Sequence, residues 1–150
     1  NRGDAVRWGM TRLQPDDLPD IEALLSAARL PTRDLGGHVA FVGARTVGGR
    51  LGGVAGLETV GAWGLVRSVA VRAEARGGGL GARLVAAVED AARGMSLTNL
   101  VLLTTTAEAF FASLGYVPTR RGALPPEVRA LSEFADVCPA SAACLSKRIG

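Results

Sequence analysis

The sequence predicts one α/β domain in which a single sheet carries helices on its faces. The chain has 150 residues, the usual size of one domain, and 48% of them are apolar, enough for one hydrophobic core. Short stretches typical of strands come mixed with longer stretches whose apolar residues recur at helical spacing. Mixed strands and helices favour a sheet with helices packed against it, and we expect residues 1–150 to form that one domain.

The first half of the chain predicts a strand, a helix and then three strands in succession. Apolar positions alternate over residues 6–13, which indicates a strand. Asp16 and Asp17 are typical of a helix start, because an Asp side chain can cap free backbone N–H groups. That helix is expected to end before Pro31, since proline disfavours helical geometry in the residue before it. The following strands are predicted at residues 39–46, 51–59 and 64–72, with glycine turns at 48–49 and 61.

The second half predicts helices that alternate with short strands. Residues 80–93 have apolar side chains on one helical face, and residues 100–103 form a fully apolar strand of the buried type. Gly115 is expected to be the left-handed cap that ends a helix over residues 107–114. The remaining elements are predicted as a strand at 116–119, a helix at 125–137 and a strand at 143–149.

Composition and charge argue against several classes of protein. Seventeen basic and fourteen acidic residues give a net charge of +3, and the basic residues are scattered singly or in pairs. A nucleic-acid partner is not expected, because it would need a basic patch, whereas a mild positive charge suits a small anionic ligand. No apolar stretch reaches the ~18 residues that would cross a membrane, and the first ten residues show no export signal. A cytoplasmic location without membrane attachment is therefore the expectation.

The cysteines and the histidine do not form a metal-binding pattern. The chain has two cysteines, Cys138 and Cys144, and one histidine, His38, which is too few for the usual zinc site. Both cysteines are expected to be reduced and to pack as small hydrophobic residues, and no metal is expected.

Residues 69–82 contain the most informative motif, in which a strand, a glycine-rich turn and a helix start follow one another. Free N–H groups and the helix dipole at such a helix start bind anions, and glycines let a phosphate approach the backbone. The alternative is a tight turn that needs glycine only for its own backbone. A dinucleotide site would need an acid about 20 residues further on, but the next strand ends at residues 104–106 in three threonines. A P-loop is excluded because no Gly-Lys-Ser/Thr is present.

Two segments carry a resemblance to a known family. Arg76-x-x-Gly79-x-Gly81 resembles the R/Q-x-x-G-x-G/A signature of GNAT acetyltransferases, and residues 107–116 resemble the A-x-x-F-Y-x-x-x-G-F segment of that family. The resemblance implies a mixed, largely antiparallel sheet with helices on both faces, whose two central parallel strands, 64–72 and 100–104, splay apart in a V. It implies acetyl-CoA as cosubstrate in that gap. The implied cofactor-binding residues are Val69, Ala70, Val71, Arg76, Gly77, Gly78, Gly79, Leu80, Gly81, Ala82, Thr104 and Phe111.

A narrower resemblance is to the ArsN-type N-acetyltransferases, which are associated with arsenic resistance. It is carried by residues 30–35, 56–58, 65–71, 102–107 and 133–142. It implies an acceptor that is an amino acid or an amino-acid-like arsenical. With it, a thiol site for an arsenical at Cys138 and Cys144 stays open as the alternative to cysteines that only pack. The chain departs from the wider family at Phe111, where many members have a tyrosine that acts as general acid, and at Thr104, where many have asparagine. Phe111 has no proton to give to a leaving thiolate.

Two charged residues lie in strands that are otherwise apolar. Glu58 is interpreted either as the general base that deprotonates the amine or as a solvated or structural carboxylate. Arg67 is interpreted either as a clamp for the acceptor's carboxylate or as the partner of an acid, with Glu58 the nearest candidate. Ser68 and, more weakly, Arg33 complete the residues expected on the substrate side.

The sequence thus predicts an N-acetyltransferase that moves an acetyl group directly from acetyl-CoA to the amine of a small molecule. The alternative is a non-catalytic acyl-CoA-binding regulatory module, which Phe111 favours. Acetylation of a protein amine is a third interpretation and would require a long open groove, whereas the predicted helix at 125–137 favours a covered site. The acceptor's identity and a homodimeric assembly stay open.

Overall fold

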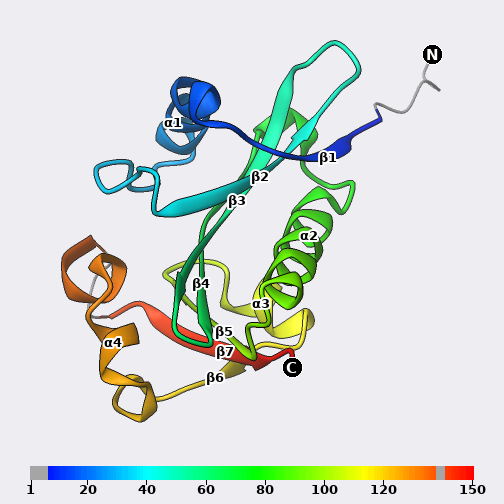
Figure 1. Cartoon of the computed structure of the whole chain (residues 1–150). Coiled ribbons are helices and arrows are strands. Elements are labelled where there is room, and N and C mark those ends of the chain that lie inside the picture. Colours follow the sequence, from blue (N-terminus) through cyan, green and yellow to red (C-terminus); the bar gives the residue numbers. More distant parts are fainter. Residues whose placement is uncertain (1–6, 138–140) are drawn as a thin grey trace.

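The computed structural model describes residues 7–137 and 141–150 and shows one sheet with helices on both faces (Figure 1). The strands are β1 (Gly9–Arg12), β2 (Val39–Arg45), β3 (Leu51–Val60), β4 (Trp63–Val71), β5 (Asn99–Thr104), β6 (Val117–Pro118) and β7 (Ala143–Arg148). The α-helices are α1 (Leu18–Ala27), α2 (Leu80–Gly94), α3 (Glu108–Ser113) and α4 (Pro126–Arg129). Short turns of other helix types are η1 (Pro15–Asp17), η2 (Ala73–Ala75), η3 (Arg121–Ala123) and η4 (Glu133–Val137). No helix in the described part of the chain is long and apolar enough to cross a membrane.

Within the described residues seven strands run in the order β1-β2-β3-β4-β5-β7-β6, and β4 and β5 are the one parallel pair among them. Their pairing is confined to residues 63–65 of β4 and 99–101 of β5. Beyond these pairs β4 continues to Val71 and β5 to Thr104 without bonding to each other. The predicted V-shaped splay between two central parallel strands is therefore confirmed, and so is the predicted fold class.

A β-bulge interrupts the ladder between β3 and β4 at the start of the splay. Val54 pairs with Ala70 and Gly56 with Arg67, so residue 55 of β3 faces two residues of β4, 68 and 69. Ser68, one of these two residues, has a left-handed backbone conformation, at φ 56°. A bulge leaves one residue out of the ladder, so it frees backbone groups of β4 beside the gap.

Alternate residues of the strands pack against helices on opposite faces of the sheet. Leu84, Val85 and Val88 of α2 are buried against one face, together with Val66 of β4. Leu65, the next residue toward the N-terminus, packs on the other face in a cluster with residues from 101 to 128. Figure 1 shows α1 and α4 on this second side and α2 and α3 on the first. The sheet is thus covered on both sides, with the splay between the layers.

Helices α1, α2 and α3 end in the same backbone motif. After each helix one residue takes a left-handed φ, and these residues are Arg29 (61°), Ser96 (63°) and Gly115 (96°). In α1 the N–H of Arg29 bonds to the carbonyl of Ser26 at 3.0 Å and that of Leu30 to Leu25 at 2.9 Å, which is a Schellman cap. The left-handed cap predicted at Gly115 is confirmed.

The helix predicted at residues 125–137 is wrong as a continuous element. Residues 126–129 form α4, where the α-helix is interrupted. Residues 133–137 then form the wider π-helical turn η4. The physical reason is visible at the break, where the side chains of Ser132 and Glu133 both turn toward polar partners on the sheet side. The first strand is also shorter than predicted and begins at Gly9.

Candidate functional site

Two cavities meet at the splay between β4 and β5. One, the turn cavity, has a volume of about 540 Å³ and is bordered by the glycine turn before α2. The other, the Arg67 cavity, has a volume of about 330 Å³ and lies between Arg67 on β4 and the threonines that end β5. The residues that line both cavities are Leu30, Val69, Thr106, Ala107 and Phe111. A ligand extending from one cavity to the other would therefore pass the bulge in β4.

The turn cavity is bordered by the backbone of the glycine turn, which has open space beside it. Gly77 and Gly79 take left-handed φ values of 91° and 78°, and a side-chain carbon built at residues 77, 78 or 79 would meet no atom within 4 Å. Gly79 caps α2 without a side-chain hydrogen bond, and the first turn of α2 carries no acid. Its first N–H groups are thus left for an anion, which the helix dipole also favours.

The residues expected to bind the cofactor gather around the turn cavity, except for two. Gly78 does not line it, and Thr104 lines the Arg67 cavity instead. Gly81 also has a packing role, since a side-chain carbon there would meet Phe110 at 3.3 Å. Leu30, on the loop after α1, lines both cavities but is not among the predicted cofactor residues, although it lies in a segment of the ArsN-type resemblance.

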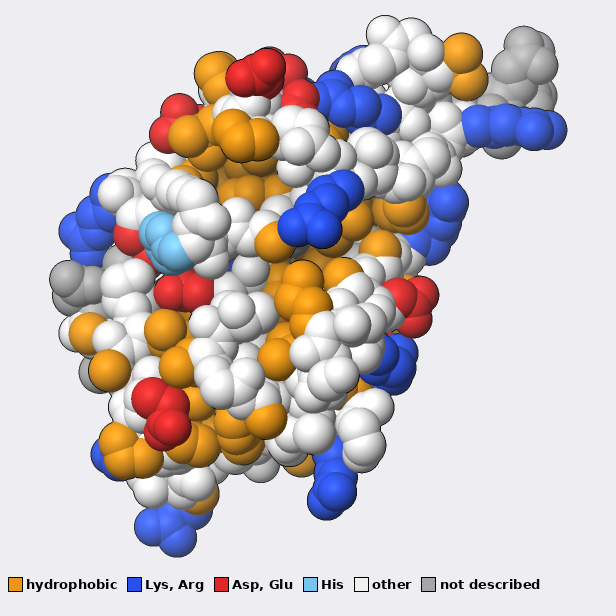
Figure 2. All heavy atoms as spheres, in the orientation of Figure 1, with side chains coloured by type: hydrophobic (Ala, Val, Ile, Leu, Met, Phe, Trp, Pro, Cys, Tyr) orange, Lys and Arg blue, Asp and Glu red, His pale blue; other side chains and the backbone are white. Residues whose placement is uncertain are grey.

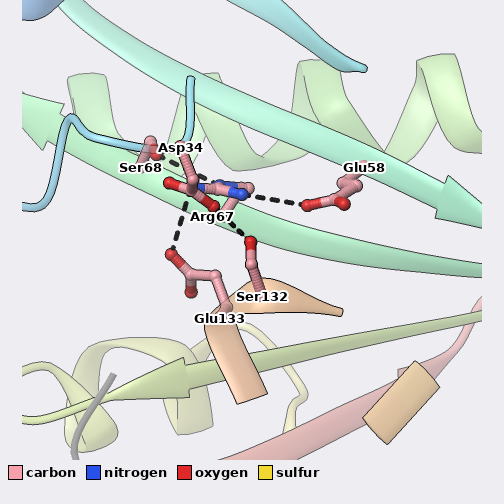
Figure 3. Close-up of polar contacts among 6 residues, drawn as sticks. All are labelled: Asp34, Glu58, Arg67, Ser68, Ser132 and Glu133. Carbon is pink, nitrogen blue, oxygen red and sulfur yellow. Dashed lines mark hydrogen bonds and ion pairs between the residues drawn. The ribbon is translucent and has the colours of Figure 1, made fainter. Parts of the chain in front are cut away.

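Arg67 is the centre of a buried cluster that joins four parts of the chain (Figure 3). Its side chain is fully buried, and its Nη1 donates to Glu58 Oε1 on β3 at 2.9 Å. Its Nη2 donates to Asp34 on the loop before β2 and lies 3.5 Å from Glu133 Oε2 in η4. Ser132 closes the cluster by donating its hydroxyl to the second oxygen of Asp34 at 2.5 Å.

The charges in this cluster stabilise each other against burial. Burial alone would raise the pKa of Asp34, but hydrogen bonds from Arg67 and Ser132 hold it below the usual value. Burial would lower the pKa of Arg67, but the hydrogen bond to Asp34, the charge of Glu133 and the hydrogen bond to Glu58 raise it. The one guanidinium stays charged and faces three carboxyl groups, so its own charge is more than offset.

Only some of the residues predicted on the substrate side line the cavities. The predicted ion pair of Arg67 with Glu58 is confirmed at 2.9 Å. Arg67 and Ser68 line the Arg67 cavity, whereas Glu58 lines neither of the two cavities that meet at the splay, and neither does Arg33, which is exposed. Asp34 and Glu133 were not singled out as site residues, because each comes from a loop or break far from Arg67 in sequence. Their presence in the segments of the ArsN-type resemblance was the available signal.

The hydroxyl groups near the splay are mostly committed elsewhere. Tyr116, the chain's one tyrosine, is buried, donates to Glu89 at 2.9 Å and lines neither of these two cavities. Burial and the neighbouring Glu89 raise its pKa far above the usual value, so it holds its proton. Thr104 accepts a bond from the N–H of Ala107, the residue before α3, at 2.9 Å. Phe111, which stands where many family members have a tyrosine general acid, lines both cavities.

The remaining candidates stay outside the site. Cys144 is half-buried and free, and burial raises the pKa of its thiol, which lowers its reactivity. Cys138 lies outside the described residues, and His38 is exposed. Within the described ranges no group of His, Cys, Asp and Glu side chains is placed to hold a metal ion. On the face shown in Figure 2, Lys and Arg side chains stand apart from one another.

Comparisons with known proteins bear on this geometry. The acetyltransferase (GNAT) domain family matches residues 35–118, more than half of the chain. N-acetylglutamate synthase from Neisseria gonorrhoeae, complexed with coenzyme A and L-arginine, is similar with a TM-score of 0.79 and 25% identity, over 97% of this chain and 34% of that one. This chain thus spans about a third of that protein's length. No curated protein gives a significant match.

Two further solved structures resemble the chain over nearly their whole length. Rv2747 from Mycobacterium tuberculosis, in complex with CoA, has a TM-score of 0.74 and 21% identity, over 93% of this chain and 98% of that one. A GNAT-family acetyltransferase from Staphylococcus aureus has a TM-score of 0.78 and 15% identity, over 95% and 99%. At these identities the likeness is one of fold.

Proposed function

The chain belongs to the GNAT acetyltransferase family, and on that premise we propose that it transfers the acetyl group of acetyl-CoA directly to the amine of a small molecule. Acetyl-CoA is the cosubstrate. The observation that carries the proposal is the meeting of two cavities at the splay, one bordered by an uncapped helix start and the other by a charged cluster. One cavity suits the anionic cosubstrate and the other its acceptor.

Acetyl-CoA would lie in the turn cavity with its pyrophosphate against residues 76–82. The open space at Gly77 and Gly79 accommodates phosphate oxygens beside backbone N–H groups, and Arg76 adds a positive charge at the rim. The acyl end would extend toward Val69, which lines both cavities. Backbone N–H groups of residues 69–71, next to the bulge, would polarise the thioester carbonyl.

The acceptor's amine would attack the thioester carbonyl carbon from the Arg67 cavity. A nitrogen–carbon bond forms, the carbon–sulfur bond breaks, and the proton lost by the amine goes to Glu58, directly or through a water. Glu58 does not line the cavity, so a water relay suits its position. A thiol has a pKa near 8.5, so the thiolate can leave before it is protonated by water, and Phe111 need not donate a proton.

The finer identity of the acceptor belongs to this proposal. The ArsN-type resemblance supports an amino acid or an amino-acid-like arsenical, and with it a role in arsenic resistance. Arg67 remains a proposed clamp for the acceptor's carboxylate, with Ser68 beside it in the cavity and Arg33 on the loop. A carboxylate that reached Arg67 would displace Asp34 or Glu133. The proposal also includes one domain over residues 1–150, a cytoplasmic location and assembly as a homodimer.

The alternative, a non-catalytic acyl-CoA-binding module, is favoured by Phe111 and by the full engagement of Arg67. A protein amine as acceptor is less well supported, because residues 29–31 and Glu133 border an Arg67 cavity of only about 330 Å³. Thiol release from acetyl-CoA, measured across amino acids, their phosphorus and arsenic analogues, and polyamines, separates these functions. Release that depends on one class of acceptor supports the enzyme, and release with none supports the binding module.

The cysteines should be dispensable for acetylation. Direct transfer needs no thiol nucleophile, and Cys144 lines neither of the two cavities at the splay and has a raised thiol pKa. We expect the double variant Cys138→Ser, Cys144→Ser to keep kcat and KM within about threefold of wild type, since neither change touches the proposed chemistry. Loss of activity in the folded double variant, checked by circular dichroism, would instead support a thiol site for an arsenical.

A further inference from the structure

One of the cations that line the Arg67 cavity is not paired with an acid in the described part of the chain. The charged residues that line it are Arg29, Arg67 and Glu133. Arg67 is buried and shared among three carboxyl groups. Arg29 is exposed and makes no ion pair or side-chain hydrogen bond within the described part of the chain. An anion that entered this cavity would therefore find its free positive charge at Arg29.

The backbone fixes where Arg29 lies. It occupies the left-handed position of the Schellman cap of α1, at φ 61°, and both cap hydrogen bonds are present. This conformation is strained for a side chain with a Cβ, and glycine adopts it freely. The equivalent position after α3 is Gly115, and after α2 it is Ser96. The cap by itself thus has no need of arginine at residue 29.

The neighbouring residue ties Arg29 to the place of transfer. Leu30 follows it directly and lines both cavities, and Arg29 itself lines the Arg67 cavity, so Arg29 is next in sequence to a residue shared by the two cavities. Glu133 lines the same cavity with a carboxylate. The cavity therefore presents a positive group and a negative group to one ligand, which is the pattern that a zwitterion fits.

We propose that Arg29 is the residue that receives the acceptor's anionic group, a carboxylate or an oxyanion of similar shape, while the amine end faces Glu133 and the meeting point of the cavities. This rests on the proposed function, and within it Arg29 is the alternative to the Arg67 clamp, because Arg67 is already shared among three carboxyl groups. A guanidinium suits the role because its fork binds carboxylates and related oxyanions through two parallel hydrogen bonds.

The test compares acceptors that differ only in the carboxylate. Each standard amino acid and its carboxamide is assayed with wild type, Arg29→Gly, Arg29→Lys and Arg67→Lys, with Ser96→Gly as the matched cap control. We expect wild type to prefer the acid and Arg29→Gly to reduce the acid-to-amide ratio of kcat/KM about 10- to 100-fold, the size of a lost charged hydrogen bond. Arg29→Lys should keep part of the preference, and Ser96→Gly all of it.

Stability gives a second readout. Glycine relieves the left-handed strain, so Arg29→Gly should unfold at a temperature no lower than wild type, as Ser96→Gly should. The ratio then reports recognition and not folding. A preference lost only in Arg67→Lys would overturn the inference, and so would a wild type that acetylates these acceptors but does not prefer the acids over their amides.

Calorimetry separates this inference from the proposed function. The same acids are titrated into the protein saturated with CoA, where no acetyl transfer takes place. Binding that weakens in Arg29→Gly, in a protein that acetylates none of the acids, would overturn the enzymatic function and leave the anion site standing. Acetylation of the acids with equal binding in wild type and Arg29→Gly would support the enzymatic function and overturn the anion site at Arg29.

Discussion

Replacing Gly79 with asparagine should weaken CoA binding by about 10- to 100-fold while the protein stays folded. Gly79 has φ 78°, lines the turn cavity and has no atom within 4 Å of a built side-chain carbon. Asparagine tolerates this backbone conformation better than other residues with a Cβ, so it adds a side chain with little strain. The added amide would occupy the space proposed for the pyrophosphate. Calorimetric titration with CoA measures the effect.

Gly49 supplies the matched control for this variant. It also has a left-handed φ, 88°, and no atom within 4 Å of a built side-chain carbon, but it lies in the turn between β2 and β3 and lines neither cavity. Gly49→Asn should therefore carry the same backbone strain and bind CoA as wild type does. Equal CoA affinity in Gly79→Asn and Gly49→Asn would show that the pyrophosphate lies elsewhere.

Replacing Glu58 with glutamine should lower kcat by about 10²- to 10⁴-fold if Glu58 accepts the amine's proton. Glutamine keeps an oxygen that can accept the 2.9 Å bond from Arg67, so the cluster should persist. Without the base, the rate should rise with pH until the amine loses its proton unaided, whereas wild type should level off at lower pH. The measurement is kcat against pH with a saturating acceptor.

Glu133→Gln is the matched comparison. This variant removes another carboxylate from Arg67, and Glu133, unlike Glu58, lines the Arg67 cavity. A purely electrostatic effect on Arg67 would appear in both variants, in KM or thermal stability, without a changed pH profile. A changed pH profile confined to Glu133→Gln would transfer the base to Glu133. Wild-type rates at all pH values in Glu58→Gln would remove the role from Glu58.

The sheet could be predicted from the sequence because its signals are local. The apolar strands and the periodic face of α2 lie in continuous stretches, and the structure has them within a few residues of the predicted bounds. Gly115 was predicted as a cap because glycine is the usual left-handed residue. Arg29 has the same backbone role and could not be predicted, because arginine carries no signal for that conformation.

The Arg67 cluster could be predicted only in part. The pair with Glu58 followed from adjacent strands, since a buried charge needs a partner. Asp34 and Glu133 join through a loop and through the break after α4, and neither shows a periodic pattern. The same contacts explain why the helix predicted at 125–137 is interrupted, because Ser132 and Glu133 both reach the cluster. Such non-local polar contacts are decided by tertiary packing.

Direct acetyl transfer is the central claim, and one measurement tests it most directly. Wild-type protein is incubated with acetyl-CoA labelled with ¹³C in the acetyl group and with the acceptor panel, and both free thiol and N-acetylated product are quantified. We expect one labelled acetyl amide for each thiol released, with release that depends on the acceptor. CoA that binds while no acceptor gains the label would contradict it and identify the chain as an acyl-CoA-binding module.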